Sequence, residues 1–448
     1  MKSVMQNISI KNRRMCLGFF AGCGQIVLIC LAFPVMAESL SVSPALRALV
    51  ASVQDSNPAI KAAQAAVDAA RARTVASGQP LYNPSLTLEA EDGDVATTTV
   101  GLSQTLDWSD KRGAERDIAN AILTAAETEL ATTQRQLTGE LLEALARFQT
   151  AREQHQLALK RSKLMQEFAA TAERRRIAGD ISKLEATLAR LAQSEAQVQQ
   201  ARASTALIEA ETILKAITGP LIDQGTNQGI NQASTTWPEL PTTLPPPPSS
   251  VDVDAALMRL PEIRLRLAQI QTAQARTRLA TRSRRPDPTF SLRAGKEGDS
   301  SLVGVGVEIP LFVRRNLRAE IEAAGYDITQ TEQTLDEARR RTSAQIEGAL
   351  ARYRIAAEAW QVWETSGLPD LMEQIALLQR LWEAGELSTA DYLVQAHQTV
   401  DAQMQSVELL GDVRQAAIAW LQAFGQIESW LDLPNPAPVD TTHSGAQK

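Results

Sequence analysis

The stretch Val303-Gly304-Val305-Gly306-Val307-Glu308-Ile309-Pro310-Leu311 alternates apolar side chains with glycine, glutamate and proline. A period of two is that of a β-strand with one apolar and one polar face. Thr289–Gly295 alternates in the same way, and the polar stretch 296–300 between the two predicts a turn. Strands of about nine residues have the length of tilted membrane-spanning strands. A soluble hairpin would show the same alternation, so the strands alone leave both alternatives open.

The hairpin and its surroundings occur twice in the chain. Four pairs of segments correspond in the same order, at offsets of 204, 205, 206 and 206 residues: Tyr82–Leu88 with Pro286–Leu292, Val100–Leu106 with Val305–Leu311, Ile177–Ser182 with Glu383–Ser388, and Thr218–Gly219 with Phe424–Gly425. Because the order is kept and the offset changes so little, we interpret the chain as one duplicated unit.

Each unit is predicted to contain a helix, two strands, a very long helix, a glycine turn and a helix of medium length. The segments around the hairpins are rich in Ala, Leu, Glu, Gln and Arg, which favour helices. The predicted helices are Asn57–Gly78, Lys111–Ile177 and Ser182–Ile217 in the first unit, and Pro261–Ser283, Arg314–Glu383 and Ser388–Trp430 in the second. Gly367-Leu368-Pro369 predicts a bend or break in the second long helix. The short and medium helices together nearly equal the long one, so we expect them to stack end to end beside it.

The four predicted strands distinguish this chain from a long coiled-coil rod, which would have no use for them. Nothing after residue 37 approaches the roughly 18 apolar residues of a transmembrane helix. The mature chain could therefore cross a bilayer only as a closed barrel of strands. Four strands are too few to close a barrel, so membrane insertion requires an oligomer.

The first 37 residues have the features of an export signal. Four basic residues and no acid precede Glu38, an apolar run covers residues 26–33, and Val35-Met36-Ala37 fits cleavage after Ala37. The residues before Cys23 loosely resemble a lipidation box, which leaves a lipoprotein as the alternative. We expect a signal peptide at 1–37, a first repeat at 38–217, a Pro- and Gly-rich linker at 218–250, a second repeat at 251–433 and a flexible C-terminal tail at 434–448.

The composition of the mature chain excludes several functions. All three cysteines lie within the signal, so neither a disulfide nor a thiolate metal site is expected. The formal charge of −7 becomes −11 without the four basic residues of the signal, which argues against binding to nucleic acid. The three histidines are scattered, and no nucleophile motif, P-loop or dinucleotide fingerprint occurs. We therefore expect no enzymatic activity, no cofactor and no metal site.

The duplication, export signal, paired hairpins and long helices together resemble the TolC-type outer-membrane factors, over essentially the whole mature chain. Asn83-Pro84, Leu102-Ser103-Gln104 and Asp110–Arg116 are similar to the heavy-metal, CzcC-like branch of that family, which often has N-P, then L-S-Q, then G-K-R-x-A-R. Asp110 stands where this branch has glycine.

The resemblance implies a mainly α fold with a small β-barrel portion. Three chains would form one twelve-stranded outer-membrane barrel, continued by a long periplasmic α-helical barrel. It further implies a passive exit duct for metal cations or drugs, set in outer-membrane lipid, with a periplasmic adaptor and an inner-membrane RND pump as partners. The rival interpretation is a periplasmic coiled-coil scaffold or adaptor-like protein.

The resemblance also implies two groups of functional residues at the glycine turns. The expected adaptor-docking tips are Ala178, Gly179, Asp180 and Ser182 in the first unit, and Ala384, Gly385, Glu386 and Ser388 in the second. The candidates for a periplasmic gate are Trp382, where the family has a gating aromatic, Asp391, which matches an acidic ring, and its counterpart Glu185. The usual arginine of the gate is Leu387 in this chain. Ordinary helix packing for Trp382 and a helix N-terminal acid for Asp391 are the simpler alternatives.

A third group of candidates lies on the polar side of the predicted strands. Glu89, Glu91, Arg293 and Glu308 are the candidates for the barrel lumen. Together with Asp299 in the turn, the acids could tune the passage of cations. A solvated polar face is the simpler alternative.

Overall fold

The computed structural model describes residues 42–92, 94–219, 237–241, 245–248, 251–312, 317–384 and 386–433. The predicted signal peptide with Cys23 and Ala37, most of the predicted linker, the tail 434–448 and Gly385 lie outside the described residues. The described residues, which begin at Val42, form one unit.

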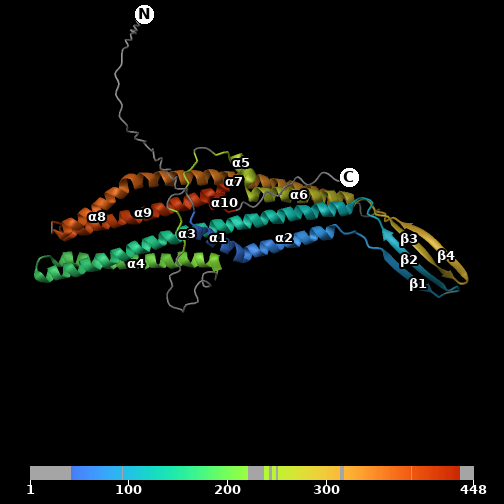
Figure 1. Cartoon of the computed structure of the whole chain (residues 1–448), viewed down its shortest axis with the longest axis horizontal. Coiled ribbons are helices and arrows are strands. Elements are labelled where there is room, and N and C mark those ends of the chain that lie inside the picture. Colours follow the sequence, from blue (N-terminus) through green and yellow to red (C-terminus); the bar gives the residue numbers. More distant parts are fainter. Residues whose placement is uncertain are drawn as a thin grey trace, which may run out of the picture. The chain divides into compact units, whose positions relative to one another are not determined.

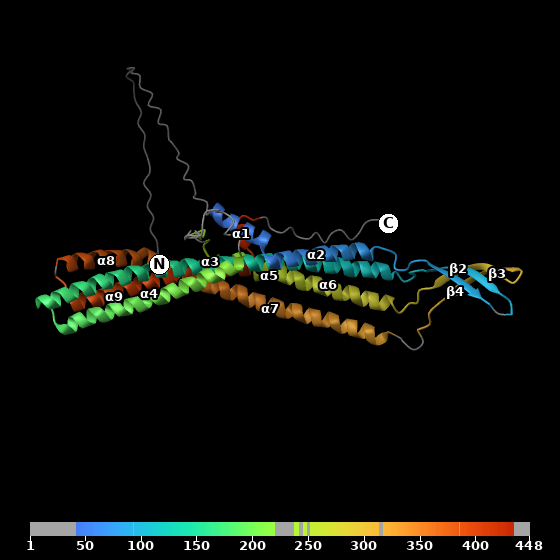
Figure 2. The same cartoon turned by 90° about the horizontal axis from the view of Figure 1, so that it is seen from below.

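Long helices make up most of this unit (Figures 1 and 2). The helices of the first repeat are α1 (Pro44–Ser56), α2 (Pro58–Ser77), α3 (Lys111–Ala178) and α4 (Lys183–Thr218), and those of the second are α5 (Val253–Arg259), α6 (Pro261–Arg282), α7 (Arg318–Val362), the π-helical turn η2 (Trp363–Gly367), α8 (Leu368–Glu383), α9 (Thr389–Phe424) and α10 (Ile427–Trp430). The six predicted helices are present, with bounds that differ by a few residues. Among the described helices, none is both long enough and apolar enough to cross a bilayer.

The sequence-based helix assignments need three corrections. The helices α1 and α5 were not predicted, although Pro44 in the first turn is a common helix start. The segment predicted as one helix, 388–430, is two, because Gly425 takes a φ of +74° and ends α9. The predicted bend or break at 367–369 is a single π-helical turn, and the chain continues without a break. Pro369 is accommodated because it lies in the first turn of α8.

Both long helices begin after a residue in the left-handed conformation. Asp110 has a φ of +56° and Leu317 a φ of +53°. This region favours glycine, which gives a physical reason for the glycine at this position in the branch that the sequence resembles. Asp110 tolerates it because its carboxylate accepts a hydrogen bond from the Gly113 backbone N–H (3.2 Å) and one from Arg282 (2.8 Å).

The four strands form one antiparallel sheet in the order β1-β2-β3-β4. They are β1 (Ser85–Glu91), β2 (Thr97–Thr105), β3 (Thr289–Glu297) and β4 (Ser300–Glu308). The predicted turn 296–300 was too long, since only Gly298 and Asp299 separate β3 from β4 and Gly298 supplies the positive φ of +58°. β4 therefore starts and ends three residues earlier than predicted. The two hairpins join through β2 and β3, where Leu102 lies opposite Leu292.

The register gives the sheet one apolar and one polar face. The apolar face carries Leu86, Leu88, Val100, Leu102, Phe290, Leu292, Val303, Val305 and Val307. Each of these side chains is exposed in the single chain, Val305 by 86%. A contiguous apolar surface of this kind marks an interaction with lipid or with another protein.

The short and medium helices stack end to end along the long helix, as expected. Both α2 and α4 pack on α3, and the Asn57 side-chain amide at the start of α2 donates to the Ile217 carbonyl at the end of α4 (3.4 Å). The second repeat makes the same junction, where a side chain on Gly425 would contact Leu260 at the start of α6.

The main core surrounds the middle of α3. Leu141, Leu142 and Leu145 are fully buried there and pack with Ile346 of α7 and Ile418 of α9. The helices α1, α5 and α10 contribute further side chains to the same core, so the two repeats are joined at mid-length. Toward the glycine turns the buried side chains are mostly alanines, which lets the helices approach closely.

Candidate functional site at the helical tips

The same backbone hydrogen bond closes the helix before each tip. At the first tip, Gly179 takes a φ of +86° and the Asp180 backbone N–H donates to the Arg175 carbonyl (2.9 Å). At the second tip, the Glu386 backbone N–H donates to the Leu381 carbonyl (3.0 Å). Both bonds close the C-terminal end of a helix in a Schellman-type turn. The side chains of Asp180 and Glu386 are exposed and take no part in these backbone hydrogen bonds.

A serine followed three residues later by an acid starts the helix after each tip. The Ser182 hydroxyl accepts from the Glu185 backbone N–H (3.2 Å), and the Glu185 carboxylate accepts from the Ser182 backbone N–H (2.7 Å). These bonds hold the pKa of Glu185 below its usual value. The Ser388 hydroxyl accepts from the Asp391 backbone N–H (3.1 Å) and donates to the Asp391 carboxylate (2.6 Å). Both acids therefore cap helices; Asp391 is exposed, whereas Glu185 is half-buried.

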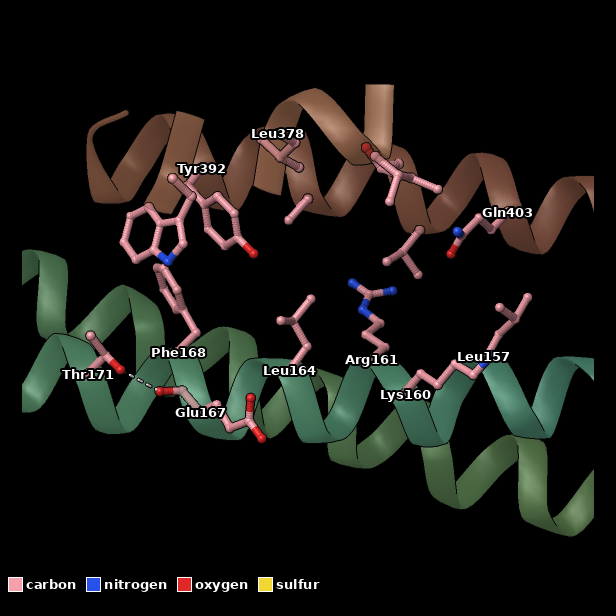
Figure 3. A pocket seen from close by; sticks show the side chains of 15 residues that line it. Leu157, Lys160, Arg161, Leu164, Glu167, Phe168, Thr171, Leu378, Tyr392 and Gln403 are labelled. Carbon is pink, nitrogen blue, oxygen red and sulfur yellow. Dashed lines mark hydrogen bonds between the residues drawn. The ribbon is translucent and has the colours of Figure 1, made fainter. Parts of the chain in front are cut away.

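Trp382 lies in an aromatic cluster that we define as Phe168, Trp382 and Tyr392. Figure 3 shows Phe168 and Tyr392 pointing toward each other from opposite helices. The ring centroids of Trp382 and Tyr392 are 4.4 Å apart with planes at 29°, and the Phe168 ring is 5.3 Å from each. The Arg175 guanidinium lies 5.0 Å from the Trp382 ring centroid, within cation–π range. Phe168 and Tyr392 are buried, whereas Trp382 is half-buried.

The aromatic cluster joins the two repeats near the tips. Phe168 belongs to α3, whereas Trp382 and Tyr392 belong to α8 and α9, so the three rings bridge the helical pairs of the two units. Small side chains such as Ala169 and Ala396 and larger ones such as Met165 surround the rings. The rings therefore contribute large apolar contacts that hold α3 against α8 and α9 at this level.

A cavity of about 570 Å³ lies between α3 and the α8–α9 pair, with the aromatic cluster on its wall (Figure 3). Arg161 points across it from α3 toward α9 and pairs with Asp401 at 3.5 Å. Arg161 also donates to the Gln199 side chain on α4, and His397 lies 2.8 Å from Asp401. Beside the aromatic cluster, Arg161 thus joins α3 to both α4 and α9 through polar contacts.

The structure brings some of the predicted gate residues together and leaves others apart. Trp382 stacks on Tyr392, the residue that follows Asp391, so the gate candidates of the second repeat are neighbours. Glu185 makes its hydrogen bonds within its own turn at the first tip. Sequence reasoning missed Phe168, Tyr392 and Arg175. Aromatic residues make up only 4% of the chain, so the rarity of Phe168 and Tyr392 was the signal that could have identified them.

The lumen candidates share the polar face of the sheet. The register places Glu89, Glu91, Arg293 and Glu308 on this face, and Asp299 in the turn between β3 and β4. Within the described part of the chain, no three or more His, Cys, Asp or Glu residues come together in an arrangement that could hold a metal ion.

A buried polar cluster at the junction of sheet and helices was also missed. The Asp287 carboxylate accepts from the Tyr82 hydroxyl (2.7 Å), the Lys111 ammonium (2.8 Å) and the Ser109 hydroxyl (3.5 Å). Burial alone would raise the pKa of Asp287, but the bonds from Lys111 and Tyr82 outweigh it and lower that pKa. Burial and the bond to Asp287 raise the pKa of Tyr82 to about 12.

Comparison with known proteins identifies relatives of both the sequence and the fold. The family described as outer membrane efflux protein matches residues 49–220 and 253–426, one block for each repeat. Over 343 residues the chain is 24% identical to the cobalt-zinc-cadmium resistance protein CzcC of Cupriavidus metallidurans, covering 75% of this chain and 79% of the relative.

Solved structures of outer-membrane channels have the same fold. The outer-membrane channel OprN superposes with a TM-score of 0.71 at 17% identity, over 86% of this chain and 90% of OprN. The Campylobacter jejuni CmeC outer membrane channel superposes with a TM-score of 0.69 at 15% identity, over 86% of each chain. The Vibrio cholerae outer membrane protein VceC gives 0.67 at 16% identity, over 85% of this chain and 96% of VceC.

Proposed function

Because the chain belongs to the outer membrane efflux protein family, we propose that three copies of it form a passive exit duct across the outer membrane and the periplasm. In this assembly the four-stranded sheets of three chains close one twelve-stranded barrel, and the helices continue it as a periplasmic tunnel. The chain is then the outer-membrane channel subunit of a tripartite efflux system, and it carries out no chemical step of its own.

The observation that carries this proposal is the two-faced sheet. Its apolar face is exposed in the single chain, whereas its opposite face is polar, as in a barrel with lipid outside and water inside. The outer strands β1 and β4 each have one free edge in the described chain. Edges cannot stay unpaired in lipid, so β1 of one copy must pair with β4 of the next.

The helices also support an oligomer. Leu184, Leu188, Leu191 and Val198 lie at helical spacing on α4 and are exposed in the single chain. Such a stripe needs a partner, and a neighbouring copy at the same level of the tunnel supplies one. The alternative of a periplasmic scaffold would explain this stripe but leaves the apolar face of the sheet exposed to water.

We further propose that the cargo is a heavy-metal cation, because the relative CzcC is a cobalt-zinc-cadmium resistance protein. The partners are a periplasmic adaptor, which docks at the two tips, and an inner-membrane pump of the RND class. The mature subunit begins after the predicted signal peptide, and the two repeats are joined by the Pro- and Gly-rich linker. Lipid of the outer membrane surrounds the sheet.

The aromatic cluster is our candidate for the latch of the periplasmic gate. Its rings connect α3 with α8 and α9, so they hold the two helical pairs of one chain together near the tips. Arg175 stacks on Trp382, and Leu387 replaces the arginine expected from the family resemblance. Asp391 supplies the negative charge next to this cluster.

The test of the proposed function compares two arginine substitutions on opposite faces of the sheet. Val305→Arg places a charge on the apolar face, where an arginine at the bilayer midplane costs about 2–4 kcal/mol. We expect it to remove the heat-resistant trimer from the outer-membrane fraction and to abolish metal resistance in a strain that lacks the native gene. Thr87→Arg, on the polar face, keeps the trimer.

Two results would contradict the proposal, one for the duct and one for its cargo. Recovery of the wild-type chain in the soluble periplasm, with no trimer in the outer membrane, would establish the scaffold instead. If the trimer forms but growth on cobalt, zinc and cadmium salts is unchanged by deletion, while sensitivity to drugs rises, the duct stands and the proposed cargo is wrong.

A further inference from the structure

The polar face of the sheet carries a single cation among acids. In the described strands its charged residues are Glu89, Glu91, Arg293, Glu297 and Glu308, as the register shows. The other cation of β3, Lys296, points to the opposite face, because it is an odd number of residues away from Arg293. Arg293 is therefore the one positive charge on this face of the described strands.

Arg293 lies between the acids along the strand direction. Glu89, Glu91 and Glu297 are displaced from it toward the hairpin turns, and Glu308 is displaced toward the helices. Its own cross-strand row consists of Thr87, Gly101, Arg293 and Gly304, without any carboxylate. The row of Glu89 lies two residues away, about 7 Å along the strand.

The neighbours of Arg293 leave its charge open to water. Gly101 and Gly304 flank it on β2 and β4, and a side-chain carbon on Gly304 would lie 2.8 Å from the arginine Nε. The arginine therefore lies across Gly304, along the wall of the sheet. Its side chain is exposed and makes neither a hydrogen bond nor an ion pair with another residue of the described chain.

We propose that Arg293 is a charge-selectivity residue of the duct, a ring of three positive charges that lowers the permeability of the barrel to cations. This inference rests on the proposed function, because only the assembled trimer turns the polar face into the wall of a lumen. The carboxylates on either side concentrate cations, and the ring between them opposes their passage. Because Arg293 lies flat over Gly304, it acts through its field rather than by blocking the lumen.

The experiment measures the reversal potential of the purified full-length trimer in planar bilayers under a potassium chloride gradient. Arg293→Ala should shift this potential toward that of potassium, with a rise of roughly two-fold in the permeability ratio of potassium to chloride at about 0.1 M salt. The shift should shrink at about 1 M salt, where screening is stronger. Arg293→Lys should keep the wild-type value. Lys296→Ala is the matched control on the same strand and should change nothing.

Each outcome decides a different question. An Arg293→Ala trimer with wild-type selectivity would overturn the role of Arg293 and leave the duct intact. Absence of any channel from the wild-type protein would overturn the proposed function instead. If Arg293→Ala does not form trimers, Arg293→Gln removes the charge and keeps most of the side chain, and the same comparison is made with it.

Discussion

At the scale of single residues, the Asp287 carboxylate joins three segments that are far apart in the chain. It binds Tyr82 before β1, Ser109 and Lys111 after β2, and itself precedes β3. The cluster therefore ties the bases of both hairpins to the start of α3. Its counterpart in the first repeat is Asn83, so only the second repeat supplies the charge. Sequence spacing showed this correspondence, but not that Lys111 and Asp287 meet.

We predict that Tyr82→Phe lowers the free energy of unfolding by about 1.5–3 kcal/mol, because it removes a hydrogen bond to a charged group. The pKa of Tyr82 is raised from 10.0 to about 12 in the folded chain, so its contribution is complete below pH 10 and is lost as the pH rises to about 12. Denaturant unfolding between pH 7 and pH 12 should show a smaller alkaline loss in the variant. Tyr326→Phe, at an exposed tyrosine, serves as control and should match the wild type. Equal stabilities of both variants at pH 7 would contradict the prediction.

At the scale of elements, the sequence predicted what local pattern determines. Alternation located the four strands, and helix-forming composition with glycine stops located the six main helices. The local sequence pattern could not predict that β2 pairs with β3, or that Phe168 contacts Trp382, since these contacts join segments about 200 residues apart. The turn 296–300 was predicted too long because polar residues suit turns and exposed strand ends equally well.

At this scale we predict how the aromatic cluster affects the gate. Trp382→Ala removes two ring contacts, each worth roughly 0.5–1.5 kcal/mol. A loss of about 1.4 kcal/mol shifts the ratio of closed to open gate tenfold. We therefore expect a higher single-channel conductance in planar bilayers with an unchanged amount of trimer. Trp382→Phe keeps a ring and should behave nearly as the wild type.

Asp391→Asn tests the negative charge of Asp391 separately from the packing of the aromatic cluster. The amide oxygen still accepts from the Ser388 hydroxyl, so the helix cap is kept while the charge is removed. A conductance that rises in Asp391→Asn but not in Trp382→Ala would assign the gate to the acid and refute the aromatic latch.

At the scale of the whole molecule, duplication gives two tips that are closed by the same backbone hydrogen bond but have different surroundings. Gly179 and the serine caps could be identified from the sequence, because left-handed turns and helix starts have local signatures. The ring contacts that distinguish the second tip could not, since Trp382 acquires its stacking partners from α3 and α9. The second tip therefore lies beside the candidate gate, whereas both tips present an exposed acid to a partner.

Charge reversal at the tips tests whether those exposed acids dock the adaptor. Asp180→Lys and Glu386→Lys change side chains that take no part in the closing backbone bonds, so stability should change by no more than about 0.5 kcal/mol. Like charges in an interface cost far more, so we expect each variant to lose metal resistance and co-purification with the adaptor while trimer levels stay at wild type. Asp92→Lys, at the opposite end of the unit, is the control and should keep resistance. Retained resistance in both tip variants would remove these acids from the docking surface and leave the tip backbone as the remaining contact.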